Sequence, residues 1–183
     1  MKTYTDEELN TLLGKANFWN PIQITGLFHY LGGIEGFDEV VDPNAYFKVP
    51  NIAGFKLRPN GFEITMMNKF KRYYTAIPFS KIISISLEDK EQVTVNKEKS
   101  VVGRAIIGGL LLGPVGAIVG GMSGLKDGTT NLPMPDLILS VEMGDNKENP
   151  ERVVMFSCSY KNKGKVIEFF NKHAAQYFKV EKA

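Results

Sequence analysis

Hydrophobic and polar positions along the chain first follow a helical period. Thr5 and Glu8 fit a capping box, and apolar residues then recur three and four positions apart, which predicts a helix over about residues 6–18. Segment 22–31 is apolar without a clear period, so it predicts a short helix or a loop packed on a core. The first part of the chain, residues 1–45, is therefore expected to be a helical extension.

From residue 46 the period changes to two, the period of half-buried strands. Pro59-Asn60-Gly61 is a turn signal between the first two alternating segments. The pattern predicts about seven short strands, mostly antiparallel. Their centres are 55–57, 62–66, 72–77, 83–87, 92–96, 137–143 and 154–160.

The last part of the chain returns to helical spacing, with one apolar and one charged side. Its apolar positions are Val166, Phe169, Phe170, His173, Ala174, Tyr177 and Phe178. The order of elements predicts an α+β fold: a curved antiparallel sheet or open barrel, capped by a C-terminal helix.

Composition limits the class of protein. The chain has 183 residues, of which 43% are hydrophobic and 23% charged, which fits one globular domain with an appendage. The single cysteine, Cys158, cannot form an internal disulfide, and residues 1–8 do not resemble a signal peptide, so we expect a cytoplasmic protein. Because 22 basic residues are nearly balanced by 20 acidic ones, the net charge does not indicate nucleic acid as a partner.

Two short motifs carry a family resemblance. Gly61-Phe62-Glu63-Ile64, then Ile-Pro-Phe-Ser-Lys-Ile at 77–82, followed by the terminal helix, resemble bacterial pleckstrin-homology-like (PH-like) or GRAM-like domains. The resemblance covers roughly residues 46–180. It implies a domain that binds lipid headgroups or proteins, without catalytic residues or cofactors.

An insertion, residues 101–124, interrupts this domain between two predicted strands. It holds eight of the 18 glycines, and residues 105–122 carry no charge. Small residues spaced four apart would line one side of a helix and allow close packing, so the segment resembles a glycine zipper. These positions are Gly109, Gly113, Ala117 and Gly121, with Gly116 and Gly120 on a second ladder.

Three structures remain open for the insertion. Gly113-Pro114 at its middle favours a hairpin, packed on its own domain or on a second copy of the chain. A membrane-inserted or re-entrant segment is the second, although each arm of a hairpin is too short to cross a bilayer. A flexible glycine-rich loop is the third, and the sustained apolar content argues against it.

Few residues are candidates for a binding, metal or catalytic site. Lys69, Lys71 and Arg72 cluster between two predicted strands and form a candidate site for a phosphorylated headgroup; the alternative is an ordinary solvated hairpin. His29 and His173 have no partners at metal-binding spacing, and we expect His173 in the core and His29 semi-buried. Cys158 is expected to be an inert core thiol. No catalytic, cofactor or metal site is predicted.

The sequence therefore predicts a non-enzymatic binding or scaffold module, acting at the inner face of a membrane or in self-assembly through 101–124. A membrane-active, pore-forming effector that oligomerises through the same segment is the alternative. A third hypothesis is a small-ligand pocket near Phe28, His29 and Tyr30. The expected partners are a membrane, a second copy of the chain or another protein.

Overall fold

The computed structural model describes residues 3–34, 52–68, 71–89, 137–146 and 150–180. Within these residues one eight-stranded sheet has the order β4-β3-β2-β1-β7-β6-β5-β8. The strands are β1 (Gln23–Gly32), β2 (Ile52–Arg58), β3 (Gly61–Asn68), β4 (Lys71–Pro78), β5 (Ile82–Asp89), β6 (Leu137–Met143), β7 (Arg152–Cys158) and β8 (Phe178–Val180). The helices are α1 (Asp6–Leu13) and α5 (Lys163–Ala174), with 3-10 turns at Phe79–Lys81 and Tyr160–Asn162.

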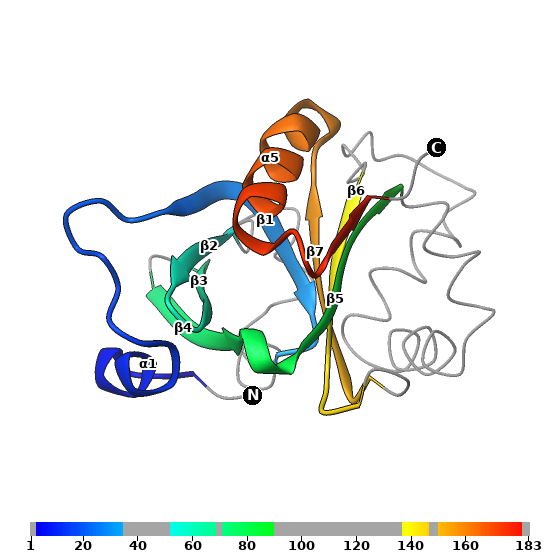
Figure 1. Cartoon of the computed structure of the whole chain (residues 1–183). Coiled ribbons are helices and arrows are strands. Elements are labelled where there is room, and N and C mark those ends of the chain that lie inside the picture. The colour runs from blue at the N-terminus through cyan, green and yellow to red at the C-terminus, as the bar shows by residue number, and fades with distance from the viewer. Residues whose placement is uncertain (1–2, 35–51, 69–70, 90–136, 147–149, 181–183) are drawn as a thin grey trace.

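The sheet is curled, and its two parts face each other across a common core. In Figure 1, β2, β3 and β4 form one side, β5, β6 and β7 form the other, and α5 lies over the opening between them. All neighbouring strands pair antiparallel except β5 and β8, which are parallel. The mostly sheet architecture with a capping C-terminal helix agrees with the predicted fold class.

The predicted strands from β2 onward that lie in the described residues are present. The turn at Pro59 and Asn60 joins β2 to β3, with Arg58 paired to Gly61. Along β3 the three alternating apolar positions are fully buried: Phe62, Ile64 and Met66 are each at most 1% exposed. The predicted strand at 92–96 lies outside the described residues.

Segment 22–31 is a strand, so its prediction as a helix or loop was wrong. β1 lies at the centre of the sheet, between β2 and β7, and joins its two parts. Its register shifts twice, between Ile24 and Phe28 and again between Tyr30 and Gly32. These bulges bend the strand and interrupt its alternation, which explains why no period of two was visible in the sequence.

The core is built around aromatic rings, and Phe55 lies at its centre. Its ring centroid is 4.9 Å from that of Phe156, 5.1 Å from Phe28 and 5.3 Å from Phe170. Phe170 comes from α5, so the helix closes the curled sheet by inserting a ring between its two sides. Edge-on packing of this kind is the arrangement that aromatic quadrupoles favour.

Both helices end earlier than the sequence predicted. α1 has the expected capping box, in which the Thr5 N–H donates to Glu8 Oε2 at 2.8 Å, but it stops at Leu13 instead of 18. Gly14 takes φ +78° and donates its N–H to the Asn10 carbonyl, and this left-handed residue ends the helix.

The C-terminal helix stops at Ala174 and does not continue to Phe178. Phe178 begins β8, which pairs with β5, and the Ile85 N–H donates to the Tyr177 carbonyl at 2.8 Å. A buried aromatic at position 178 satisfies the helical period and an inward-facing strand position equally well. The sequence pattern alone therefore did not separate the two.

The motif at 77–82 forms the corner between the two parts of the sheet. Pro78 ends β4, residues 79–81 make a 3-10 turn, and Ile82 starts β5. The ring of Phe79 stacks on Tyr177 and meets Phe62 edge-on, with centroids 5.9 and 5.3 Å apart. The motif that carries the family resemblance therefore forms this corner and packs it against Phe62 and Tyr177.

Candidate binding surface on the outer face of β1–β4

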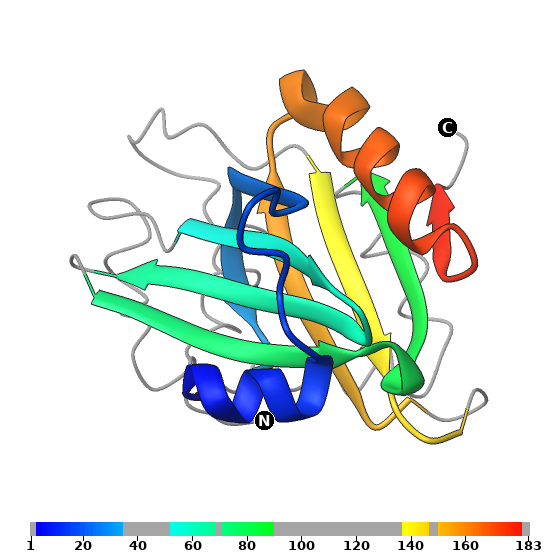
Figure 2. The same ribbon diagram turned by 60° about the vertical axis from the view of Figure 1, so that its left-hand side comes forward.

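The outer face of β1–β4 is half covered by α1. Leu9 and Leu13 are fully buried against Ala76 of β4, and Figure 2 shows α1 lying along β4. The Asn60 N–H donates to the Leu13 carbonyl at 3.0 Å, which fixes the end of α1 on the β2–β3 turn. Among the described residues, no helix covers the remainder of the same face, and a hollow lies there.

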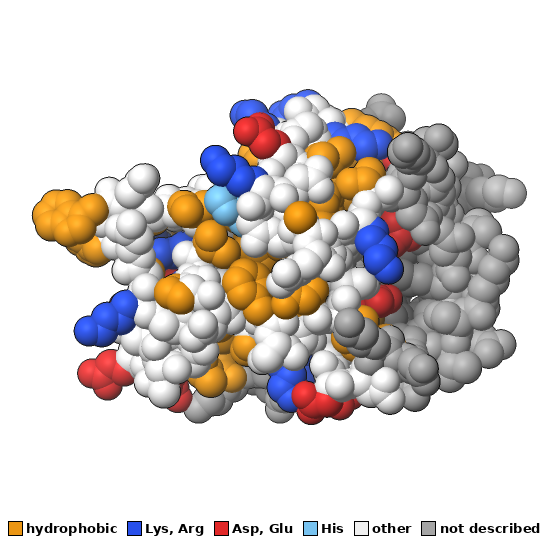
Figure 3. All heavy atoms as spheres, viewed as in Figure 1, with side chains coloured by type: hydrophobic (Ala, Val, Ile, Leu, Met, Phe, Trp, Pro, Cys, Tyr) orange, Lys and Arg blue, Asp and Glu red, His pale blue; other side chains and the backbone are white. Residues whose placement is uncertain are grey.

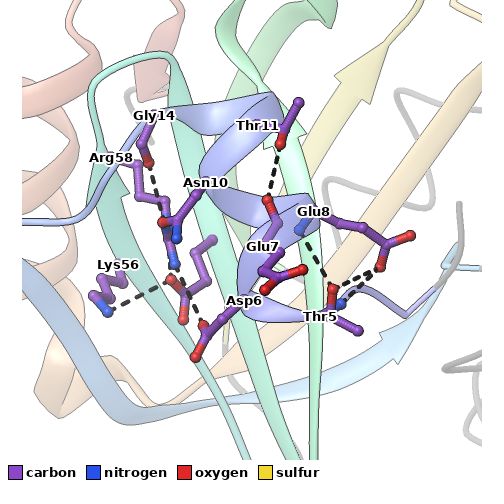
Figure 4. A network of polar contacts seen from close by, with 10 residues as sticks. Thr5, Asp6, Glu7, Glu8, Asn10, Thr11, Gly14, Lys56 and Arg58 are labelled. Atoms are coloured by element: carbon purple, nitrogen blue, oxygen red, sulfur yellow. Dashed lines mark hydrogen bonds and ion pairs between the residues drawn. The ribbon is translucent and has the colours of Figure 1, made fainter.

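A buried ion pair stands at the edge of the covered half (Figure 4). Arg58 Nε donates to Glu63 Oε2 at 2.6 Å, and both side chains are at most 4% exposed. Arg58 Nη1 also donates to Asn10 Oδ1 at 2.7 Å and to the Gly14 carbonyl at 3.1 Å. Because these acceptors lie in α1 and at the residue that follows it, the guanidinium connects the helix to the sheet.

The open half contains a shallow hollow of about 390 Å³. Four strands contribute to it, so the residues that line it are far apart in the sequence. They are Gln23, Thr25, Gly26, Ile52, Ala53, Gly54, Lys56, Glu63, Thr65, Met67, Arg72 and Tyr74.

Two glycines shape the floor of the hollow. A Cβ on Gly54 would approach Thr25 Cγ2 to 2.9 Å, so glycine permits β1 and β2 to lie close together there. Gly26 sits at the β1 bulge with φ +71° and has nothing within 4 Å of a Cβ position. The hollow thus forms where bare backbone replaces side chains.

The side chains around the hollow carry more positive than negative charge. Lys56 and Arg72 are its cations, and Glu63 is its carboxylate. Glu63 is already engaged at 2.6 Å by Arg58, with Lys56 Nζ farther away at 3.5 Å. An anionic group is therefore the ligand that this lining best accommodates.

The predicted basic cluster reaches this hollow through one residue. Lys71 and Arg72 open β4 and are exposed, and Arg72 lines the hollow. Lys69 and Phe70 lie outside the described residues. Sequence reasoning found Arg72 because cations cluster around it, but the neutral lining residues carried no such signal.

A smaller hollow of about 220 Å³ lies beside the β6–β7 turn and is lined by Lys81, Met143, Gly144, Glu151 and Arg152. Lys81 Nζ contacts the carboxylate of Asp145. This hydrogen bond raises the pKa of Lys81 above its ordinary value. The acidic and basic groups here compensate one another, so this hollow is a weaker candidate.

Neither of the two histidines lines the hollow on β1–β4 or the smaller hollow. His29 is half-buried, as expected, and burial lowers its pKa. His173 is also only half-buried, near the Phe169 ring at 5.2 Å, so its expected place in the core was wrong. Burial, and the neighbouring charge of Lys172, lower the pKa of His173.

Other predicted residues are core residues. Cys158 is 1% exposed and packs in the core, as expected. Phe28 and Tyr30, expected near a ligand pocket, are fully buried and pack their rings against Phe156. In the described part of the chain no group of acidic, histidine or cysteine side chains could hold a metal ion.

The small-residue ladder falls outside the described residues. This applies to Gly109, Gly113, Gly116, Ala117, Gly120 and Gly121. Among the residues that the structure does describe, no helix is long and apolar enough to cross a membrane.

One exposed feature was not predicted from the sequence. Phe18 and Trp19 follow α1 in the α1–β1 loop and are 85% and 92% exposed. Because the predicted helix ran to residue 18, the pair was split between a helix end and a turn. The available signal was the sequence Asn17-Phe18-Trp19-Asn20-Pro21, whose flanking residues favour a loop.

Comparison with known families agrees with this architecture. A curled sheet capped by a C-terminal helix, with a glycine-rich insertion before β6, defines a PH-like domain that carries a glycine zipper. The model of the family "Glycine zipper containing PH domain" matches residues 50–157, more than half of the chain, and the protein belongs to this family. Searches of curated proteins and of solved structures gave no significant match.

Proposed function

We propose that this PH-like domain is a non-enzymatic binding module that attaches to an anionic lipid surface at the cytoplasmic face of a membrane. The observation that supports the proposal is the surplus of positive charge at the hollow on β1–β4. Arg72 and Lys56 line it, and its carboxylate is already bonded to Arg58. Lys71 extends this charge to the start of β4. From its position in the sequence we include Lys69 in the proposed site.

Electrostatic attraction alone makes such attachment weak. Each cation near an anionic surface contributes about 1 kcal/mol, so the four cations of the proposed site, Lys56, Lys69, Lys71 and Arg72, contribute about 4 kcal/mol at low salt. That corresponds to an affinity of only about 1 mM. Stable attachment therefore needs a second contact, and we assign this role to segment 101–124, packed on a second copy or on the membrane.

Vesicle flotation tests the headgroup site. Lys69→Ala, Lys71→Ala and Arg72→Ala together should weaken binding to vesicles that contain phosphatidylserine, most clearly at low salt. Lys161→Ala, Lys165→Ala and Lys172→Ala together form the matched control, because these exposed lysines lie on or next to α5. Equal loss of binding in both variants would show that only net charge matters, and no loss in the first would refute the site.

The role of segment 101–124 is tested with larger residues in its ladder. Gly113→Leu and Gly121→Leu should reduce assembly, measured as mass in solution and in detergent, because leucine fills the groove that close packing needs. A plain apolar anchor predicts the opposite, since leucine strengthens insertion. Release of dye from vesicles by the wild type would instead support the pore-forming alternative.

A further inference from the structure

The α1–β1 loop carries the most exposed large hydrophobic side chains that the structure describes. Trp19 is 92% and Phe18 85% exposed, and their rings meet edge-on with centroids 5.7 Å apart. In Figure 1 this loop extends away from the sheet, and Figure 3 shows hydrophobic atoms standing clear of the body at its outer end. An aromatic pair this exposed is unfavourable in water unless something covers it.

Two backbone N–H groups of the loop tip are hydrogen-bonded within the loop. Asn17 Oδ1 accepts hydrogen bonds from the N–H groups of Trp19 and Asn20, both at 3.1 Å, and Pro21 has no N–H. After the tip, the Ile22 carbonyl accepts from the Leu57 N–H at 2.8 Å. Polar groups that already have partners lower the cost of moving this tip out of water.

The charge of the loop also favours a lipid surface. From Gly14 to Ile22 the one ionisable side chain is Lys15, which is exposed, and the loop has no carboxylate. Tryptophan is enriched at membrane–water interfaces, because its ring is apolar and its N–H is polar, and cations are attracted to anionic headgroups. A projecting tip suits insertion between lipids, whereas a protein partner would need a deep groove to receive it.

We propose that Phe18 and Trp19 insert into the headgroup region of a lipid membrane and anchor the domain there. The inference rests on the proposed membrane attachment, but it uses different residues and a different force, apolar insertion in place of charge. The loop precedes the part of the chain that matches the family, residues 50–157, so the anchor is an addition to the shared domain.

Trp19 is the single tryptophan of the chain, so its fluorescence reports on this site alone. We expect a blue shift when the full-length protein meets vesicles of phosphatidylcholine with phosphatidylserine, and quenching by lipids brominated in their acyl chains. Unchanged emission from protein that floats with the vesicles would overturn the proposal. A blue shift that grows with protein concentration in the absence of lipid would overturn it in favour of a second copy.

Flotation of two variants separates this proposal from the headgroup site. Phe18→Ser with Trp19→Ser should weaken vesicle binding roughly tenfold, a loss that partial burial of two aromatic rings can account for. The control is Leu12→Ser, whose side chain is 42% exposed on α1. The unfolding temperature of the double serine variant should agree with the wild type, because Phe18 and Trp19 are at least 85% exposed.

These experiments distinguish failure of the aromatic anchor from failure of the headgroup site. Wild-type binding by the serine variant refutes the aromatic anchor and leaves the headgroup site intact. Wild-type binding by the Lys69, Lys71 and Arg72 alanine variant, together with loss of binding by the serine variant, refutes the headgroup site and supports the anchor. Absence of any vesicle binding by the wild type refutes both.

Discussion

Arg58 and Glu63 show how one residue pair can connect an appendage to the domain. Both side chains are almost completely buried, so neither charge is well solvated, and each depends on the other. Replacing Arg58 with Ala leaves the Glu63 carboxylate buried without its nearest partner. We expect a loss of about 3–5 kcal/mol in the free energy of unfolding, measured by urea denaturation.

Lys56 provides the matched control for that experiment. It also faces Glu63, but at 3.5 Å and with 27% of its side chain exposed. Lys56→Ala should therefore cost less than about 1 kcal/mol. Equal losses for Lys56→Ala and Arg58→Ala would contradict the conclusion that Arg58 is the main partner of the Glu63 carboxylate.

His29 makes stability depend on pH. Burial lowers its pKa below the ordinary 6.5, so the unfolded chain binds protons more readily than the folded one. Its contribution is complete above pH 6.5 and is lost as pH falls through the lower folded pKa. We expect the unfolding temperature to drop between about pH 7 and pH 5 and the drop to shrink in His29→Gln. His173 shifts in the same direction, so part of the drop should remain.

At the scale of elements, sequence patterns succeeded where the two faces of a strand meet chemically different surroundings. β3 alternates because Phe62, Ile64 and Met66 face the apolar core, whereas Glu63 on the opposite face pairs with Arg58. β1 was missed because bulges break its alternation, and because Leu31 and Gly32 near its end are both buried. The period of a pattern reveals an element only when its surroundings differ between its two sides.

The end of α1 was also not predicted, and Gly14, which ends this helix, allows a test. It has φ +78°, and a Cβ there would meet Pro59 Cγ at 3.1 Å. Gly14→Ala should lower the free energy of unfolding by about 1 kcal/mol or more. Gly164→Ala is the control, because Gly164 lies in α5 with open space around it, and it should stabilise by about 0.5–1 kcal/mol. Thermal unfolding of both variants checks the opposite signs.

At the scale of the whole molecule, no sequence pattern could have located the hollow. Its lining comes from β1, β2, β3 and β4, and it exists because these strands lie side by side with Gly26 and Gly54 between larger residues. Arg72 was identified from its neighbours in sequence, whereas Lys56 became part of the site only through strand pairing. A site whose residues are brought together by strand pairing can be located only when that pairing is known.

The same topology predicts that the domain folds without its insertion. Asp89 ends β5 and Leu137 begins β6, and these two residues are direct partners in the antiparallel pair. Paired residues have Cα atoms only about 5 Å apart, so a short connection can join the two strands. We expect that replacing residues 101–124 with a short Gly-Ser linker leaves a single cooperative thermal transition.

Measurement by calorimetry and by circular dichroism tests that expectation. The core around Phe55 draws on β1, β2, β3, β7 and α5. Coincident transitions at a temperature near that of the wild type would place segment 101–124 outside the folding unit and free it for packing against a membrane or a copy. A broad or absent transition would instead make the segment part of the core, and the proposal that it serves as a contact surface would then fail.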